Sequence, residues 1–155
     1  MIPTEHIHPM LVHFPIVFFL CLTAIDLVAL IRGKSVTGRT ALGNLSSGLA
    51  VVAGISAIVT WFFGGLALDL AEAGGFRSDV AETHEGLGTA TAAVFVLWAI
   101  VRAILWWRNT RGGRAMLSGV AVVEILGVFL VSLTAYFGGE LVYGLGVNVS
   151  RAVGG

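Results

Sequence analysis

The sequence predicts an all-α integral membrane protein, an up-down bundle of four helices, and three observations lead to this fold class. Apolar residues make up 57% of the 155 residues and charged residues only 12%, with a mean hydropathy of +0.94. That composition cannot coat a soluble globule. Four stretches are apolar over the length of about 20 residues that a membrane helix requires. Short, polar, glycine-containing connections separate them, so consecutive helices should be antiparallel neighbours.

The four spans are expected at residues 9–31, 41–70, 80–107 and 114–137. The second has no Asp, Glu, Lys or Arg from Ala41 to Leu68. Its small residues Ser46, Ala50 and Gly54 recur every four positions, a spacing that lets another helix approach closely, within the chain or in a dimer. We find no internal sequence repeat, no low-complexity tract and no soluble domain, so residues 1–155 are expected to form one domain.

Basic side chains concentrate in the connections that follow the first and third spans. Seven of the nine lie in or next to these connections: Arg32, Lys34, Arg39, Arg102, Arg108, Arg111 and Arg114. The positive-inside rule places both connections in the cytoplasm, which leaves the acidic middle connection and both termini outside. We therefore expect a multi-pass membrane protein with N-out, C-out orientation. Equal numbers of basic and acidic residues, nine each, argue against nucleic-acid binding.

Histidines near the outer ends of the first and third spans are the candidate cofactor ligands. Pro9 suits the first position of a helix, and the third helix is expected to begin at Ser78 or Asp79. Both starts put His13 and His84 about one turn inside their helices, at the same depth. Two neutral imidazoles on facing helices can hold a b-type haem without covalent attachment. Interfacial hydrogen bonding, a metal ion and a proton relay are the alternatives.

The rest of the opening segment His8–Pro15 supports this hypothesis. Pro15 has no N–H to donate to the carbonyl of Leu11, so it should bend the helix just after His13 and aim that imidazole inward. The alternative is that Pro15 is an ordinary membrane-helix proline without a functional role. His8 lies about 140° round the helix from His13, so we expect it to cap the helix, contact a propionate or bind a partner. Four glycines offer room for a macrocycle: Gly64, Gly65, Gly86 and Gly88.

Three ionisable residues lie deeper in the spans. Asp26 and Arg102 each stand six residues before a basic residue that ends the span, so we expect them to share a depth and form a structural ion pair, in preference to a proton path. Arg102 also follows His84 by five helical turns, which puts both on one face. Glu124 has no evident partner. It is the candidate for proton transfer or quinone contact, with a protonated, hydrogen-bonded carboxyl as the alternative.

The segment after the fourth span, residues 138–149, is rich in glycine and has apolar residues spaced through it. We expect it to leave the helix, fold back over the outer mouth of the bundle and exclude water from the histidines.

The chain resembles the bacterial four-span membrane family catalogued as domain of unknown function 2231. Members open with an HPxLVHFP segment and close with TAHxGGxLVYxxGVxV; here these are His8–Pro15 and Thr134–Val149, and the likeness extends over nearly the whole chain. Relatives fused to c-type cytochrome or other redox domains imply membrane electron transfer, and the resemblance to a bacterial family implies a location in the bacterial inner (cytoplasmic) membrane. Where the family commonly has a histidine in the closing motif, this chain has Tyr136. Tyr136 is expected to hydrogen-bond a cofactor without ligating iron.

These observations favour a small haem b protein that passes electrons near the outer face, with other membrane redox subunits as partners and a quinone as a second candidate cofactor. The alternative is a cofactor-free accessory subunit of a larger respiratory or photosynthetic complex. We expect no independent enzymatic activity, because no Ser/His/Asp arrangement or phosphate loop is present. The single cysteine, Cys21, excludes an intrachain disulfide and a CxxCH haem attachment.

Overall fold

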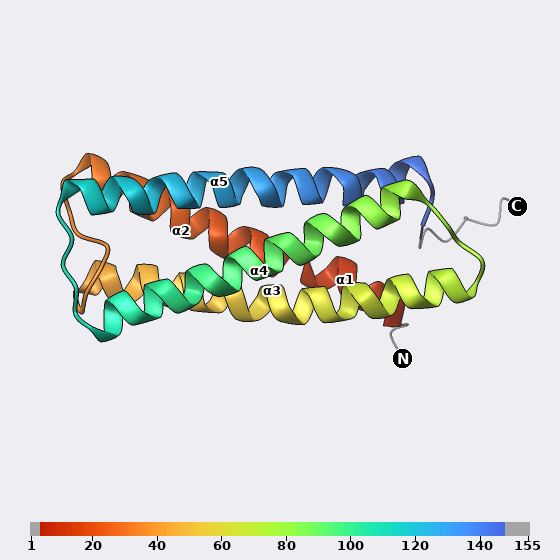
Figure 1. Ribbon diagram of the computed structural model, residues 1–155, viewed down its shortest axis with the longest axis horizontal. Coiled ribbons are helices and arrows are strands. Elements are labelled where there is room, and N and C mark those ends of the chain that lie inside the picture. The colour runs from red at the N-terminus through yellow and green to blue at the C-terminus, as the bar shows by residue number, and fades with distance from the viewer. Residues whose placement is uncertain (1–3, 148–155) are drawn as a thin grey trace, which may run out of the picture.

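A computed structural model describes residues 4–147 and shows long helices packed side by side in an up-down bundle (Figure 1). The elements are α1 (Thr4–Leu11), α2 (His13–Ile31), α3 (Ala41–Ala73), α4 (Asp79–Trp107), α5 (Arg114–Gly139) and the π-helical turn η1 (Glu140–Gly144). Four helical segments are long and apolar enough to cross a membrane, α1 with α2 and α5 with η1 each counting as one. The described residues contain no strand. The predicted fold class is confirmed.

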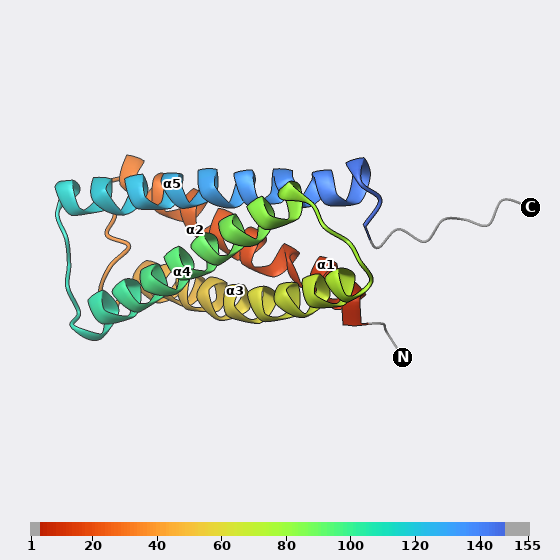
Figure 2. The same cartoon turned by 45° about the vertical axis from the view of Figure 1, so that its right-hand side comes forward.

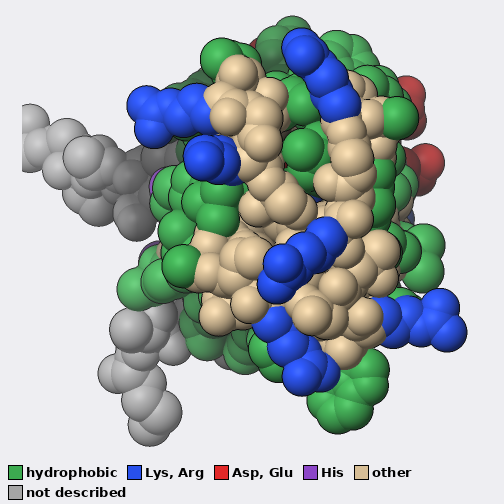
Figure 3. Space-filling model, turned by 90° about the vertical axis from the view of Figure 1, so that its left-hand side faces the viewer, with side chains coloured by type: hydrophobic (Ala, Val, Ile, Leu, Met, Phe, Trp, Pro, Cys, Tyr) green, Lys and Arg blue, Asp and Glu red, His purple; other side chains and the backbone are tan. Residues whose placement is uncertain are grey.

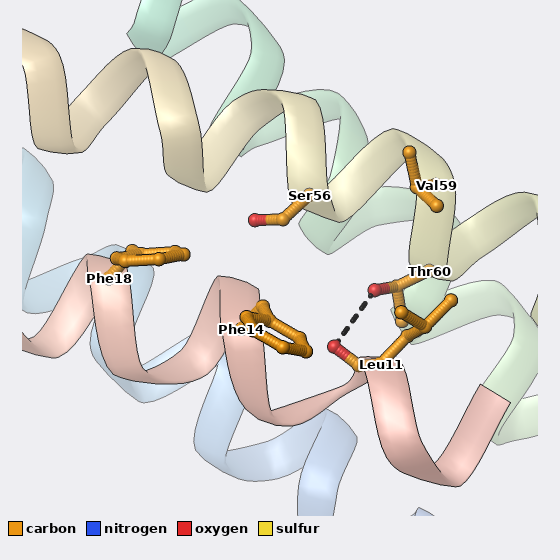
Figure 4. Close-up of a pocket in the computed structure, with 6 residues that line it drawn as sticks. All are labelled: Leu11, Phe14, Phe18, Ser56, Val59 and Thr60. Atoms are coloured by element: carbon orange, nitrogen blue, oxygen red, sulfur yellow. Dashed lines mark hydrogen bonds between the residues drawn. The ribbon is translucent and has the colours of Figure 1, made fainter. Parts of the chain in front are cut away.

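The first span starts earlier than predicted and is interrupted. α1 begins before Pro9, which lies inside it, so the prediction of a helix start at Pro9 is wrong. The interruption at Val12 follows from Pro15, because proline offers no N–H to the carbonyl of Leu11. That carbonyl accepts a hydrogen bond from the hydroxyl of Thr60 on α3 at 3.3 Å (Figure 4). The bend predicted from Pro15 is therefore present, and a neighbouring helix stabilises it.

The start of α4 agrees with the prediction and the end of α5 does not. Ser78 caps α4, its hydroxyl accepting the N–H of Val80 at 3.2 Å. The glycine-rich segment was expected to leave the helix near residue 138. Instead α5 runs to Gly139 and continues through η1 to Gly144. Glycine has both a backbone N–H and a backbone carbonyl, so a glycine-rich segment can still form the helical hydrogen bonds that a bilayer requires. Residues 148–149 of that segment lie outside the described residues.

The bundle is arranged with α2 diagonally opposite α4. Each helix packs against its neighbours in the order α2, α3, α4, α5 and back to α2, and Figures 1 and 2 both show α4 crossing α3 at an angle. A Cβ atom at Gly54 would lie only 2.8 Å from the Cβ of Ala99 on α4 and 3.2 Å from the carbonyl oxygen of Phe95. The small-residue stripe of the second span thus serves packing within the chain.

Lys and Arg side chains gather on the end of the bundle that carries the α2–α3 and α4–α5 connections (Figure 3). Arg39 joins these connections: its backbone N–H donates to Oδ1 of Asn109 and its guanidinium to the carbonyl of Trp107, both at 2.8 Å. We call this the basic end, and the end with α1 and η1 the histidine end. The positive-inside rule predicts that the basic end faces the cytoplasm.

Candidate cofactor site and buried charge cluster

Two histidines meet at the histidine end, and they are His8 of α1 and His84 of α4. Their ring centroids lie 6.2 Å apart with the ring planes at 77°. Nδ1 of His8 lies 3.0 Å from the carbonyl oxygen of Thr60 on α3, and Nδ1 of His84 lies 3.0 Å from that of Thr134 on α5. A carbonyl only accepts, so each Nδ1 carries a proton. In the neutral ring, Nε2 therefore keeps its lone pair.

Glycines on α3 and α5 provide the space that both rings occupy. A Cβ atom at Gly64 would lie 2.9 Å from Cε1 of His8, and one at Gly138 would lie 2.9 Å from Cε1 of His84. No side chain fits at either position unless the imidazole moves. Each glycine follows by four residues the threonine whose carbonyl holds the same ring. One helical turn therefore supplies both the hydrogen bond and the space.

The structure pairs His84 with His8, where the sequence analysis expected His13. His13 is exposed on the first turn of α2, beyond the interruption, and His8 is partly buried. His8 was expected to cap the helix, contact a propionate or bind a partner. In the structure it lies next to His84, because α1 starts before Pro9 and carries His8 on a formed turn beside α3.

Tyr136, expected at the cofactor, lies on another face of α5. Tyr136 lies midway between Thr134 and Gly138, the two residues of α5 that contact His84. Two residues correspond to a rotation of about 200° round an α-helix, so Tyr136 points away from the face that contacts His84. Its side chain is 62% exposed and its ring packs against Phe137 at a centroid distance of 5.5 Å. A histidine at this position would also point away from His84. The departure from the family motif therefore does not affect the His8–His84 pair.

The predicted ion pair between Asp26 and Arg102 is present. Nη1 of Arg102 lies 2.5 Å from Oδ2 of Asp26, and both side chains are fully buried. The hydroxyl of Ser46 donates to Oδ1 of Asp26 at 2.5 Å and also contacts the guanidinium. Nη2 of Arg102 donates to the carbonyl of Val36 in the α2–α3 connection at 2.9 Å. The pair thus ties three helices and a connection together.

Glu124 has partners, contrary to the sequence-based expectation. Its Oε1 accepts hydrogen bonds from Nη1 of Arg102 at 2.8 Å and from Nε1 of Trp98 at 3.2 Å. Its Oε2 is buried without a partner. Glu124 stands ten residues after Arg114, whereas Arg102 stands six residues before Arg108. The two positions therefore differ in depth, and the long arginine side chain bridges that difference. We call Asp26, Ser46, Arg102 and Glu124 the charge cluster.

An apolar pocket of about 260 Å³ opens beside the helix interruption (Figure 4). Its lining residues are Leu11, Phe14, Phe18, Ser56, Val59 and Thr60. The two hydroxyl groups in the lining already donate to backbone carbonyls, that of Thr60 to Leu11 and that of Ser56 to Val52. The pocket therefore offers apolar surface and has both its hydroxyl protons engaged.

Three contacts across the bundle join residues that stand 76 positions apart in the chain: His8 with His84, Phe19 with Phe95, and Asp26 with Arg102. Matching positions that contact one another are the mark of a two-fold arrangement. The segments against which the histidines pack also match, TWFFGG at 60–65 and TAYFGG at 134–139. The chain thus contains an internal repeat that the sequence analysis missed, and these TxxFGG segments were the signal that could have revealed it.

A family model described as "Predicted membrane protein (DUF2231)" matches residues 4–151. No curated protein and no solved structure matches the chain.

Proposed function

Because the chain belongs to the DUF2231 family of predicted membrane proteins, we propose that it works within a bilayer as an electron carrier that binds one b-type haem between His8 and His84. The observation that carries this proposal is the convergence of two imidazoles from α1 and α4, each held at Nδ1 by a backbone carbonyl. His8 replaces His13 in the ligand pair that the sequence suggested.

The hydrogen bonds of the two rings support a metal-binding role. Histidines that ligate a metal almost always donate their other ring N–H to a carboxylate, a backbone carbonyl or water, which fixes the tautomer and the ring orientation. The carbonyls of Thr60 and Thr134 accept from His8 and His84 in this way. Because both rings donate from Nδ1, the Nε2 atoms of His8 and His84 each keep a lone pair, and the two can bind one shared ligand.

The separation of the rings is also compatible with one metal between them. A metal–imidazole bond is about 2.0–2.1 Å long, and the centre of the ring lies about 1 Å beyond the bonded nitrogen. Two imidazoles on opposite sides of one metal therefore have ring centroids about 6 Å apart. The observed centroid separation is 6.2 Å. Gly65, Gly86 and Gly88 have open space where a Cβ would stand, which favours the approach of a flat macrocycle.

The surroundings favour electron transfer by a non-covalently held haem. Cys21 is exposed on α2, and a lone cysteine cannot supply the CxxCH attachment of a c-type haem. His8 and His84 would hold the haem iron, and the haem would supply one-electron redox chemistry. The chain's own residues then fix the ring orientation and shield the cofactor from water, and electrons leave at the histidine end.

A reduced-minus-oxidised absorption spectrum of the purified full-length protein tests the proposal. We expect sharp Soret and α bands that are lost in His8→Ala and in His84→Ala. His13→Ala is the matched control, because His13 is exposed, and it should keep both bands. Loss of the bands in His13→Ala with retention in His8→Ala would contradict the assigned ligand pair.

A featureless spectrum from haem-replete cells would overturn the haem proposal. It would favour the second candidate, a cofactor-free accessory subunit of a larger membrane complex. That candidate predicts co-purification with large redox subunits after mild solubilisation, and the exposed apolar faces of the bundle would then be the contact surface.

A further inference from the structure

We propose that the charge cluster near the basic end is a proton-binding site, in which the carboxyl groups of Asp26 and Glu124 share one exchangeable proton beside Arg102. This site lies at the opposite end of the bundle from the histidine pair and does not depend on the haem proposal. Its ligand is the proton itself, bound by a carboxylate to give a carboxylic acid.

The number of charges in the cluster is the first argument. α2 contributes Asp26, α4 contributes Arg102 and α5 contributes Glu124, whereas the facing part of α3 contributes the hydroxyl of Ser46 and no ionisable group. The other basic residues of the two connections are exposed. Arginine stays charged in proteins, so two ionised carboxylates would leave one uncompensated negative charge fully buried. Such a charge is costly, and one bound proton removes it.

The hydrogen bonds of the four carboxyl oxygens are the second argument. Oδ1 and Oδ2 of Asp26 accept from Ser46 and Arg102, and Oε1 of Glu124 accepts from Arg102 and Trp98. Oε2 of Glu124 is buried and receives no hydrogen bond. A buried polar atom without a partner calls for a missing donor or ligand. Oδ2 of Asp26 and Oε1 of Glu124 both accept from the same nitrogen, Nη1 of Arg102, at 2.5 and 2.8 Å, so the two carboxyl groups lie side by side and a proton on one lies next to the other.

The position of the cluster limits the side from which the proton can enter. Towards the histidine end the bundle is closed by Phe19 and Phe95, which stack at 3.9 Å and are each 1% exposed. Towards the basic end Arg102 contacts the carbonyl of Val36, which belongs to the connection covering that end. The stacked rings close the route to the histidine end, so the proton exchanges with water through the connection at the basic end. The cluster therefore opens to one side and is not a proton path through the membrane.

Infrared spectroscopy of the full-length protein in liposomes tests this site. We expect a carboxylic acid C=O band of a dry environment at neutral pH, which shifts as the proton is replaced by deuterium. In Asp26→Asn and in Glu124→Gln, the remaining carboxylate is balanced by Arg102, so either substitution alone should abolish the band. Glu82→Gln, at an exposed position of α4, is the control and should leave it unchanged.

Each other outcome contradicts the proposal. A wild-type spectrum without the band means that both carboxylates are ionised. A band that survives in one of the two amide variants means that the proton belongs to a single residue and is not shared. Loss of the wild-type band when sodium replaces choline in the buffer means that the cluster takes an alkali cation. The amide variants conserve side-chain size, and thermal melting of each checks that it is folded.

Discussion

Phe19 and Phe95 stack at a centroid distance of 3.9 Å with their planes 8° apart, and they stand at matching positions of two similar halves of the chain. The same separation in sequence relates His8 to His84 at one end and Asp26 to Arg102 at the other. The first two contacts join like residues, whereas the third joins opposite charges. The two halves have thus kept a symmetric ligand pair and acquired an asymmetric ion pair, as in parallel repeats about an axis along the membrane normal.

The stacked pair should be a main contributor to the stability of the bundle. Phe19→Ala removes a ring that is 1% exposed and opens a cavity against Phe95 and Gly127. We expect a loss of about 3–5 kcal/mol in the free energy of unfolding, measured by denaturant titration in micelles. Because the rings share one contact, the double variant with Phe95→Ala should lose less than the sum of the single losses. Phe129→Ala, at a side chain 68% exposed, should change little.

The glycines beside the histidines should be sensitive to a single methyl group. Gly64→Ala and Gly138→Ala place a Cβ about 2.9 Å from an imidazole carbon, so each should displace its ring and weaken the bond from Nδ1 to the threonine carbonyl. We expect the imidazole N–H signals of His8 or His84 to shift in NMR spectra, and haem occupancy to fall. Gly48→Ala on α3 and Gly139→Ala on α5 are matched controls, because both positions face open space. Equal effects at all four sites would contradict this role.

The spans were predictable because a bilayer forces every backbone polar group into a helix of sufficient length. The Asp26–Arg102 contact was predictable too, since equal offsets from the helix ends give equal depths. The partner of His84 was not, because the rule that places proline at a helix start assigned Pro9 to the wrong position and moved the candidate from His8 to His13. The contact of Glu124 with Arg102 was missed although their helices were expected to be neighbours, because the two positions differ in depth and the long arginine side chain bridges that difference.

The orientation follows from charge placement and is open to direct labelling. In a Cys21→Ser background, a cysteine at Lys34 or Arg111 should react with a membrane-impermeant maleimide only after the cells are opened, because both positions lie at the basic end. A cysteine at Arg77, in the connection between α3 and α4, should react in spheroplasts. All three positions are exposed or partly exposed, so absence of labelling would reflect the membrane side. The reverse pattern would show an N-in protein.

Removing the charge of Arg102 should be far more damaging than removing an exposed arginine. Arg102→Gln leaves the buried carboxyl groups of Asp26 and Glu124 without their cation, and breaking a buried pair in this way costs about 3–5 kcal/mol. Adding Asp26→Asn to the same chain removes one of the two carboxylates and should restore part of the stability. Arg77→Gln is the control: its ion pair with Glu72 is exposed, and such pairs contribute about 0–1 kcal/mol. The readout is the free energy of unfolding in micelles, and equal losses in both single variants would show that the cluster does not hold the basic end together.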